Sequence, residues 1–386
     1  MREGWEYKKL EEVCDFQGGS QPPKMEWSKE PQAGYVRMLQ IRDFTQNATD
    51  YIEYVKESKS LKYCKEDDIL IGRYGASVGK ILTGLSGAYN VAIIKTIPRE
   101  IVNKNYIKYY FLSPYFQHNL LTVSQHRAAQ AGFSKEDISD FSFPLPPLSE
   151  QQRIVSELDL LSSIIEKKKA QLKEYDQLAQ SIFYDMFGDP VTNEKGWEKK
   201  NLEEVCEKIT DGTHNSPVNT ETGDYMYITA KNIKKDGIIL DNITYVSANV
   251  HKAIFERCNP KFGDVLYIKD GVTTGVATIN TLKEEFSLLS SVALLKPQNC
   301  LVNHYLKAVL NMPSQYASIR ENMGGAAITR LTIAKINQII IPLPPLPLQQ
   351  SFASKIEAIE RQKALIQQSI AEVQMLFDSR MDDWFA

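Results

Sequence analysis

The same proline-led start of a helix occurs twice in the chain, 198 residues apart. Pro144–Leu148 and Pro342–Leu346 both read Pro-Leu-Pro-Pro-Leu, and a Gln-Gln pair follows each of them. The paired prolines exclude helix immediately before each run. Ser149 and Gln152 predict a capping box at the first start, and Pro347 suits the first helical turn of the second. Two long helices with related beginnings are therefore predicted.

Both runs continue with apolar residues at alternating spacings of four and three, which is the heptad pattern of a coiled coil. Gly188 and Pro190 predict the end of the first helix. Lys168 and Lys363 are charged members of the pattern, where a polar residue either fixes the register or extends out of the seam. Neither helix can bury such a seam alone, so they are predicted to pair. The predicted seam comprises Ile154, Leu158, Leu161, Ile165, Leu172, Ile182, Phe352, Ile356, Ile359, Ile366, Ile370, Val373 and Phe377.

The repeat extends into the segments that precede the helices. Trp5–Cys14 returns as Trp197–Cys206, and Asp68–Gly79 returns as Asp264–Gly275. Repetition of this kind indicates duplication of a whole structural unit. The predicted organisation is a module at residues 1–148, a helix at 149–188, a second module at 189–346 and a second helix at 347–386.

Each module combines strand and helix patterns. Short β-branched and aromatic runs predict strands, and longer runs that end before a proline predict helices. The glycines at 75 and 79 predict a tight β turn. The fold class is therefore predicted as α/β (α+β), with two similar modules that each have a small curved sheet. The strands are expected at Tyr35–Ile41, Asp68–Gly72 and Tyr89–Ile97, and the helices at Val102–Leu112 and Asn303–Leu310.

Charge and cysteine content restrict the class of protein. The two modules carry net charges of +1 and 0, and each helical segment carries −2. No segment is strongly basic, so affinity for DNA would need locally clustered charge or a partner. The five cysteines form no C-x-x-C pair, which predicts a reduced cytoplasmic protein without a zinc ribbon. No run has the roughly 20 apolar residues that a membrane helix needs.

No constellation of residues predicts catalysis. None of the Pro-Pro pairs precedes an aromatic residue, as the motif of an amino-group methyltransferase would require. Gly75–Lys80 resembles the end of a P-loop, but Tyr74 and Ile81 stand where that motif needs glycine and Ser or Thr. The histidines show no metal spacing. We therefore predict no catalytic residues, no metal and no cofactor in this chain.

The duplicated frame resembles the specificity subunit of type I restriction–modification systems. The resemblance rests on the Pro-Leu-Pro-Pro-Leu helix starts with their Gln-Gln pairs and on the repeated Trp-Glu-x-x-x-Leu-Glu-Glu-Val-Cys opening, and it covers essentially the whole chain. The second helix start departs from the pattern, because Pro347-Leu348 replaces the Ser-Glu of the first.

The resemblance implies a non-catalytic, DNA-binding subunit of a bacterial defence system. Each module would be a target recognition domain that reads one half of a split site in double-stranded DNA. The helices would form an antiparallel spacer that docks two methyltransferase (modification) subunits. Restriction or translocase subunits would complete the complex, and S-adenosylmethionine would bind to the methyltransferase partners. The isolated chain is expected neither to methylate nor to cut DNA.

Candidate DNA contacts follow from the chemistry of base and phosphate recognition. Arg and Lys pair with guanine, Asn and Gln pair with adenine, and hydroxyl groups bond to either base or to phosphate. Arg73 and Lys269 are equivalent, because each directly precedes a glycine-containing turn. The candidates are Gln40, Arg42, Arg73, Ser77, Lys80, Gln125, His126 and Arg127 in the first module, and His214, Asn215, Thr229, Lys231, Asn232, Lys269, Thr273 and Thr274 in the second.

Other interpretations of these features remain open at the level of sequence. Each candidate taken singly is also compatible with an ordinary solvated surface group. The near-neutral modules are compatible with a scaffold that clamps proteins rather than DNA. A fused modification enzyme is the third alternative, and the missing motifs disfavour it. A gel-shift with and without a methyltransferase partner would separate these alternatives.

Overall fold

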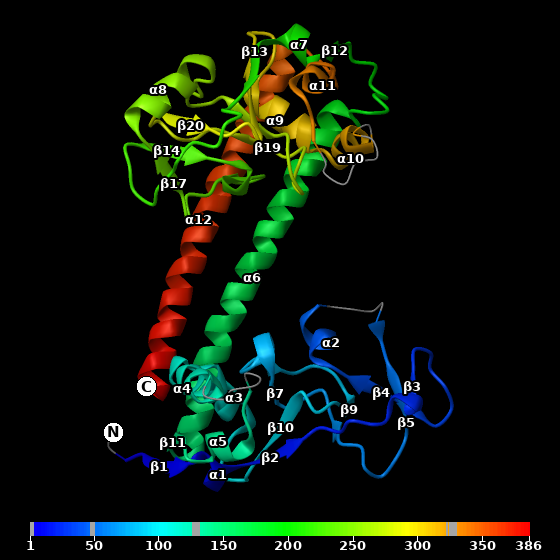
Figure 1. The fold of residues 1–386 in the computed structure, drawn as a ribbon, viewed down its shortest axis with the longest axis vertical. Coiled ribbons are helices and arrows are strands. Elements are labelled where there is room, and N and C mark those ends of the chain that lie inside the picture. Colours follow the sequence, from blue (N-terminus) through cyan, green and yellow to red (C-terminus); the bar gives the residue numbers. More distant parts are fainter. Residues whose placement is uncertain (1–3, 47–50, 126–131, 322, 324–329) are drawn as a thin grey trace. The chain divides into compact units, whose positions relative to one another are not determined.

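The computed structural model describes residues 4–46, 51–125, 132–321, 323 and 330–386. The chain forms two compact units, of which the first contains residues 1–169 and 368–386 and the second contains residues 170–367. Each unit holds one globular module together with part of α6 (Leu148–Phe187) and part of α12 (Leu346–Phe385) (Figure 1). The mixed helix and strand content of both modules confirms the predicted α+β class.

Three sheets build the first module. β1 (Glu6–Lys9) and β11 (Ser142–Leu145) pair antiparallel and thus join the two ends of the module. The second sheet is antiparallel throughout, whereas β4 and β9 of the third are parallel. The order of the second sheet is β2 (Cys14–Gly18), β10 (Ile93–Pro98), β7 (Leu70–Gly72) and β8 (Ile81–Leu82); that of the third is β3 (Trp27–Ser28), β5 (Tyr54–Lys56), β4 (Tyr35–Leu39), β9 (Gly87–Tyr89) and β6 (Tyr63–Cys64).

Short helices cover these sheets and supply most of the aromatic core. Tyr110 packs against Phe143 of β11 with ring centroids 4.8 Å apart, and Phe111 lies 4.9 Å from Phe116. All four rings are fully buried, so this cluster anchors the two longest helices of the module on its sheets. The helices are α1 (Leu10–Val13), α2 (Ile41–Thr45), α3 (Lys104–Leu112), α4 (Pro114–Gln125) and α5 (Lys135–Ser139), with 3-10 turns η1 (Lys24–Glu26) and η3 (Gly75–Ser77).

The second module repeats the two-stranded pair of its ends and the four-stranded antiparallel sheet of the first module. Its sheets are β12 (Lys199–Asn201) with β22 (Ile340–Pro342); β13 (Cys206–Asp211), β21 (Val292–Pro297), β18 (Val265–Ile268) and β19 (Ala277–Ile279); β17 (Thr244–Val246), β14 (Tyr225–Ile228) and β20 (Phe286–Leu288); and β15 (Ile233–Lys234) with β16 (Gly237–Ile238). Its helices are α7 (Leu202–Val205), η4 (Ala230–Asn232), α8 (Ala248–Arg257), α9 (Asn303–Asn311), α10 (Pro313–Glu321) and α11 (Ile333–Asn337).

One difference between the modules lies beside β9 and its equivalent β20. In the first module β6 pairs with β9, whereas in the second α8 packs on the equivalent β20, where His251 lies 3.1 Å from the Ser287 hydroxyl. Two strand predictions also need correction. The run Tyr89–Ile97 divides at Asn90, because that side chain accepts a hydrogen bond from the amide of Ala92 and turns the chain between β9 and β10. Ile41 begins α2 instead of ending β4.

A buried glutamine fixes the start of each long helix. Gln151 donates from Nε2 to the carbonyls of Ile101 and Pro146 and accepts a hydrogen bond from the amide of Asn103. The second copy repeats this set: Gln349 bonds to Cys300, Pro344 and Val302. Both side chains are fully buried, so the first glutamine of each Gln-Gln pair ties its helix to the module that precedes it.

The predicted capping box at the first helix start is wrong. α6 begins at Leu148, one residue earlier than predicted, and the amides of Glu150 and Gln151 bond to the carbonyl of Pro147. The side chain of Gln152 accepts from Asn103 instead of returning to the Ser149 amide. The other predicted helix signals are confirmed, since Gly188 has a φ of +74° after the last turn of α6 and Pro347 lies in the first turn of α12.

The two long helices pack against each other within each unit. In the first unit Glu157 of α6 pairs with Arg380 of α12 at 2.8 Å. In the second unit Phe183 packs against Phe352 with centroids 5.7 Å apart. The beginning of each helix thus contacts the end of the other, which is antiparallel pairing.

Burial follows the predicted seam. Ile154, Leu158, Leu161, Ile165, Phe352, Ile356, Ile359 and Ile366 are buried, and Leu172, Ile182, Ile370, Val373 and Phe377 are half-buried. Lys363 directs its ammonium group to Asp176 of α6 at 2.5 Å and to Asp236 at 2.8 Å. This lysine therefore supplies an ion pair between the helices, as expected of a residue that fixes register. Lys168 is half-buried.

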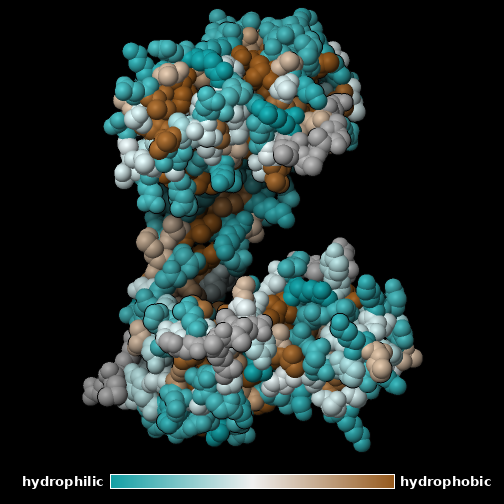
Figure 2. All heavy atoms as spheres, viewed as in Figure 1, coloured by the Kyte–Doolittle hydropathy of each residue, from teal (hydrophilic) through white to brown (hydrophobic). Residues whose placement is uncertain are grey.

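The end of each long helix completes the core of a module. Phe183 and Phe187 at the end of α6 belong to the core of the second module, and Met381 and Phe385 at the end of α12 belong to that of the first. Hydrophilic side chains dominate the visible face of each unit (Figure 2). Within the described residues, no helix combines the length and the apolar character needed to cross a membrane.

Candidate nucleic-acid interface

A glycine-bounded turn joins β7 and β8 of the first module. The turn closes through bonds from the Gly79 amide to the Gly72 carbonyl, 3.0 Å, and from the Gly72 amide to the Lys80 carbonyl, 2.9 Å. Gly79 has a φ of +79°, and a Cβ there would lie 2.6 Å from Oε1 of Gln117. Gln117 of α4 also donates to the Gly79 carbonyl at 2.9 Å. The backbone of the turn is therefore held closely against α4, in a left-handed conformation that favours glycine.

Arg73 leads into this turn with an oriented guanidinium group. Its amide bonds to the carbonyl of Ala92, and its Nε donates to the carbonyl of Phe133 at 3.2 Å. The guanidinium carbon lies 5.2 Å from the centre of the Tyr74 ring, within the range of a cation–π contact. No carboxylate of the described residues forms an ion pair with Arg73. The Nε of the guanidinium group thus bonds to Phe133, and one face of the group lies against the Tyr74 ring. The positive charge of its terminal nitrogens is not neutralised by a carboxylate of the described residues.

Two other predicted residues lie beside the same turn but are engaged with an acid. A Cβ on Gly72 would lie 3.5 Å from the side chain of Ile41, so the start of α2 contacts the turn. Gln40 and Arg42 at this start both donate to the carboxylate of Glu53, Arg42 at 2.5 Å. They are half-buried and share one acceptor, which reduces their capacity to contact DNA in this conformation.

The remaining predictions in the first module have different degrees of exposure. Lys80 and Gln125 are exposed, and Ser77 is half-buried in η3. No ion-pair partner of Lys80 occurs in the part of the chain that the structure describes. His126 and Arg127 lie outside the described residues.

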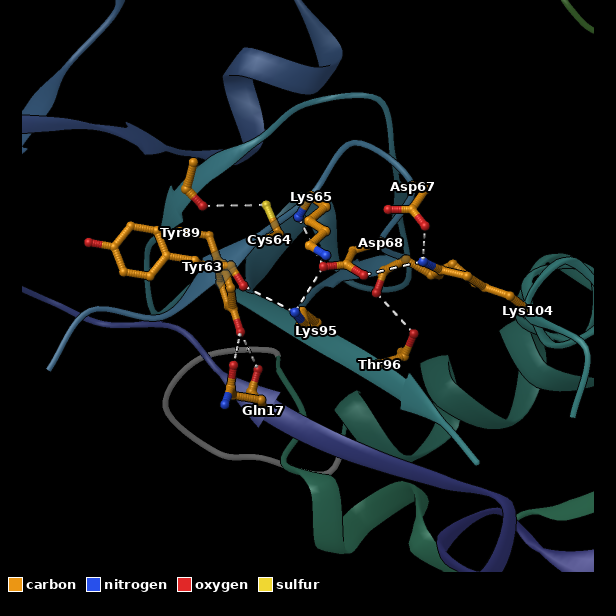
Figure 3. Close-up of polar contacts among 12 residues, drawn as sticks. Gln17, Tyr63, Cys64, Lys65, Asp67, Asp68, Tyr89, Lys95, Thr96 and Lys104 are labelled. Carbon is orange, nitrogen blue, oxygen red and sulfur yellow. Dashed lines mark hydrogen bonds and ion pairs between the residues drawn. The ribbon is translucent and has the colours of Figure 1, made fainter. Parts of the chain in front are cut away.

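Two further lysines of this module are neutralised internally (Figure 3). Lys95 and Lys104 bond to the carboxylate of Asp68 at 2.8 and 3.2 Å. Burial alone would raise the pKa of Asp68, but the bonds from these lysines and from the Lys65 amide outweigh it and lower the pKa. Asp68 therefore connects β10 and α3 to the entry of β7, and the charges of its two lysines serve the fold.

Lys269, the counterpart of Arg73, lies in a very different environment. Only 2% of its side chain is exposed, and its ammonium group lies 3.4 Å from Asp211 and 3.3 Å from Asp270. This contradicts the expectation that Lys269 offers its charge to DNA, because a buried ammonium must be paired and here has two acids. Asp211 is itself 5% exposed and also pairs with Arg257 of α8 at 3.0 Å.

Two polar residues of the second module are likewise buried and engaged, which contradicts their predicted accessibility. Thr274 is fully buried and donates to the carbonyl of Gly271 at 2.7 Å. Asn232 donates to the Ile239 carbonyl and accepts from the Thr229 amide, and so closes the turn around η4. Thr229 donates its hydroxyl to the same Asn232 oxygen. Local hydrogen bonding therefore takes up these three side chains.

Four predicted residues of the second module are exposed. Asn215, Lys231 and Thr273 face solvent, and the His214 ring is 3.2 Å from Asp211. His214 and Asn215 follow β13, whereas Thr273 lies in the turn after β18. Asp211, which lies between His214 and Lys269, was not among the candidates. An alignment of the hydroxyl residues Ser20 and Thr213, each directly after a glycine, would have indicated its position.

Four of the five thiols are buried, and the fifth, that of Cys300, is exposed. Cys14, Cys64, Cys206 and Cys258 are buried, and burial raises the pKa of the Cys14 thiol to about 12. Such a thiol stays protonated near neutral pH. Within the described ranges, no group of three His, Cys, Asp or Glu side chains is arranged to hold a metal ion.

Two similar modules with different charges at the same turn define a protein with two distinct polar surfaces, one in each unit. Residues 2–174 and 194–375 match the family described as type I restriction modification DNA specificity domain, so the chain belongs to this family. It is a specificity subunit with two tandem DNA-recognition domains. This membership confirms the resemblance seen in the repeat and the prediction of a recognition subunit.

Similar proteins cover nearly the whole chain. It is 23% identical to the type I restriction enzyme MjaIX specificity subunit of Methanocaldococcus jannaschii, over 92% of this chain and 86% of that protein. It is 20% identical to the type I restriction enzyme EcoBI specificity subunit of Escherichia coli, over 84% and 73%. The crystal structure of a type I restriction–modification S subunit from M. genitalium shares its fold, with a TM-score of 0.58 at 12% identity and coverage of 99% and 96%.

Proposed function

We propose that each module reads one half of a bipartite target in double-stranded DNA. The observation that carries this proposal is the unlike chemistry at equivalent turns. Arg73 has no carboxylate partner in the described part of the chain, whereas Lys269 is neutralised by two. One fold with two different polar surfaces suits recognition of two different base sequences, because base edges are distinguished by their donors and acceptors.

The paired helices would set the distance between the two half-sites. Their seam is buried over much of its length, and the Lys363–Asp176 and Glu157–Arg380 ion pairs each define the register in one unit. A pair of packed helices resists bending better than a flexible linker does. A fixed separation between modules would in turn fix the number of unread base pairs.

The same helices would also dock two methyltransferase subunits. Several large apolar side chains of α6 and α12 remain exposed in this chain: Leu148, Leu160, Leu178, Leu365, Met375 and Leu376. Exposed apolar residues gathered on one element are typical of protein interfaces. Leu178 and Leu376 occupy equivalent positions, 198 residues apart, so two copies of one partner would meet similar surfaces.

The complete assembly would contain restriction or translocase subunits and work in the cytoplasm. S-adenosylmethionine would bind to the methyltransferase partners, which carry out adenine methylation. The near-neutral charge of both modules supports this division of labour, because added positive charge from partners would strengthen the contacts to phosphates.

Sequencing of methylated adenines in host cells with and without this gene tests the proposal. We expect a bipartite motif with a constant spacer that disappears when the gene is deleted. A gel-shift of the purified chain, alone and with the co-expressed methyltransferase, would complement it. An unchanged methylome together with no sequence-selective binding would leave the protein-clamping scaffold as the better interpretation.

A further inference from the structure

One source of the charge difference between the modules lies in the four-stranded sheet, at the end of β2 in the first module and of β13 in the second. Ile94 is paired with Gly18 in the first module, and the equivalent Ala293 is paired with Asp211 in the second. An irregularity in β13 between Cys206 and Lys208 inserts the extra residue that brings Asp211 into this register. Gly18 and Asp211 are therefore structural counterparts, although simple sequence offsets do not align them.

Gly18 leaves room for the guanidinium group of Arg73. A Cβ built on Gly18 would lie 3.5 Å from Nη1 of Arg73, and that Cβ would have no other close neighbour. In the second module, the carboxylate at this position lies 3.4 Å from the Lys269 ammonium. Tyr74 stands at the position of Asp270, the second acid beside Lys269, so the first module lacks both acids that neutralise the cation in the second module.

We propose that Arg73 reads a guanine in the half-site of the first module, and that Lys269 reads no base in the half-site of the second. This inference rests on the proposed function of DNA recognition. Guanine presents O6 and N7 as paired acceptors in the major groove, and the terminal nitrogens of a planar guanidinium match them. The bond to the Phe133 carbonyl and the Tyr74 ring hold this plane before DNA arrives, which reduces the entropy lost on binding.

Lys80, at the end of the same turn, differs from Arg73 because no contact of the described residues orients its charged group. It is exposed and has no ion-pair partner in the described part of the chain. Such a compact charge on a long stem suits a phosphate, where position matters less than charge. The turn would therefore combine one oriented base reader with one backbone contact.

Selection from a randomised double-stranded DNA library by the full chain, co-expressed with its methyltransferase, tests this assignment. The variants are Gly18→Asp, which places an acid beside Arg73 without removing it, and Arg73→Ala. Gly18→Asn is the matched control, because it adds nearly the same volume without charge. We expect the wild type to prefer G·C at one position of one half-site on the order of 10- to 100-fold. Gly18→Asp and Arg73→Ala should abolish this preference, and Gly18→Asn should retain most of it.

The other outcomes overturn the assignment in distinguishable ways. A preference for guanine that survives Arg73→Ala shows that another residue reads the base. Uniform loss of affinity at all positions, with a salt slope reduced by about 1, identifies a phosphate contact. Altered preferences in the second half-site would contradict the assignment to the first module. Absence of any sequence preference in the wild type would instead contradict the proposed function itself.

Discussion

Phe385, the penultimate residue of the chain, packs against Tyr106 of the first module with ring centroids 5.1 Å apart. Phe187 lies 198 residues earlier and packs in the same way against Tyr305 of the second module, at 4.8 Å. The end of α12, which is far from the first module in the sequence, thus completes that module. The end of α6, which directly precedes the second module in the sequence, completes the second.

Removal of the terminal aromatic ring should destabilise the first unit selectively. Phe385→Ala leaves a cavity beside Tyr106, and we expect a loss of about 3 kcal/mol. Hydrogen–deuterium exchange should become faster in α3 and β11 and stay unchanged in the second unit. Met375→Ala on the same helix is the control, because that side chain is 65% exposed and should change stability by less than about 0.5 kcal/mol. Equal acceleration in both units would contradict this prediction.

The first 188 residues should form a dimer when expressed alone. Without α12 the first module lacks Met381 and Phe385, but Phe183 and Phe187 of a second copy stand at equivalent positions and can fill the same space. Such a dimer has two-fold symmetry and should select an inverted repeat of the first half-site. Light scattering measures the state of association. Phe187→Ala should weaken the dimer, and a well-folded monomer at micromolar concentration would refute the exchange of helix ends.

The buried glutamine at the start of α6 should contribute strongly to stability. Gln151→Leu leaves the carbonyls of Ile101 and Pro146 and the amide of Asn103 without their partner. Unsatisfied buried groups cost about 1–3 kcal/mol each, and partial access of water reduces the sum, so we expect about 3 kcal/mol in urea unfolding. Gln152→Leu, at the exposed neighbour, should cost less than about 1 kcal/mol. Similar losses for both variants would argue against a specific role of Gln151.

The glutamine pair also illustrates how far sequence reasoning reaches. The heptad spacing of the helices is a local pattern, so pairing and seam were predictable from the positions of residues such as Ile154 and Phe352. The role of Gln151 was not predictable from the sequence, because its three partners are backbone groups, two of which lie about 50 residues away. The sequence instead favoured Gln152 as a cap, since capping boxes are defined by local spacing alone.

In the candidate interface, too, features set by neighbouring residues were predictable, and features set by residues far away in the sequence were not. The turn after Arg73 was predictable from its glycines, and so was its repetition at Lys269. Buried Lys269 is neutralised by its neighbour Asp270 and by Asp211, which is 58 residues away and enters the register through an irregularity in β13. Equivalence in sequence therefore did not imply equivalence in exposure, because a strand register decides which cation is neutralised.

Stability of the second unit should decrease in acid through Glu360. Burial acts to raise the pKa of this carboxyl group, but the bond to His304 and the charge of Lys307 at 2.7 Å prevail and lower it to about 2. A lowered pKa in the folded state means that the stabilisation is complete above the usual value near 4.5 and is lost as the pH falls toward 2. Because 40% of the side chain is exposed, solvent screening limits the effect to about 1 kcal/mol.

Glu360→Gln tests this contribution. The variant should be less stable than the wild type at pH 7, and the difference should vanish as the pH approaches 2. Glu372→Gln removes the same charge from an exposed position of the same helix, where the side chain accepts a hydrogen bond from Gln368, and should leave the pH profile unchanged. Parallel urea-unfolding profiles of wild type and Glu360→Gln across this range would contradict the assignment.

The helices should act as a ruler between the two half-sites. One heptad inserted into each helix, between Ile165 and Leu172 and between Lys363 and Ile370, keeps the apolar seam in register. Seven residues add roughly 10 Å of helix, which corresponds to about three base pairs at ~3.4 Å each. Methylome sequencing of cells that carry the lengthened protein and its methyltransferase should reveal unchanged half-site sequences separated by about three more base pairs.

Insertion into one helix alone is the matched control, because an antiparallel pair lengthened on one side must bulge and lose its packing. Three base pairs also rotate the DNA by roughly 100°, so the affinity should fall unless the helices twist or the DNA deforms. Insertion of three heptads into each helix also keeps the seam in register and adds about nine base pairs, close to a full turn of DNA, and so separates this rotation from the length. Methylation at the original spacing would refute the ruler, and altered half-site sequences would show that the modules had changed with the helices.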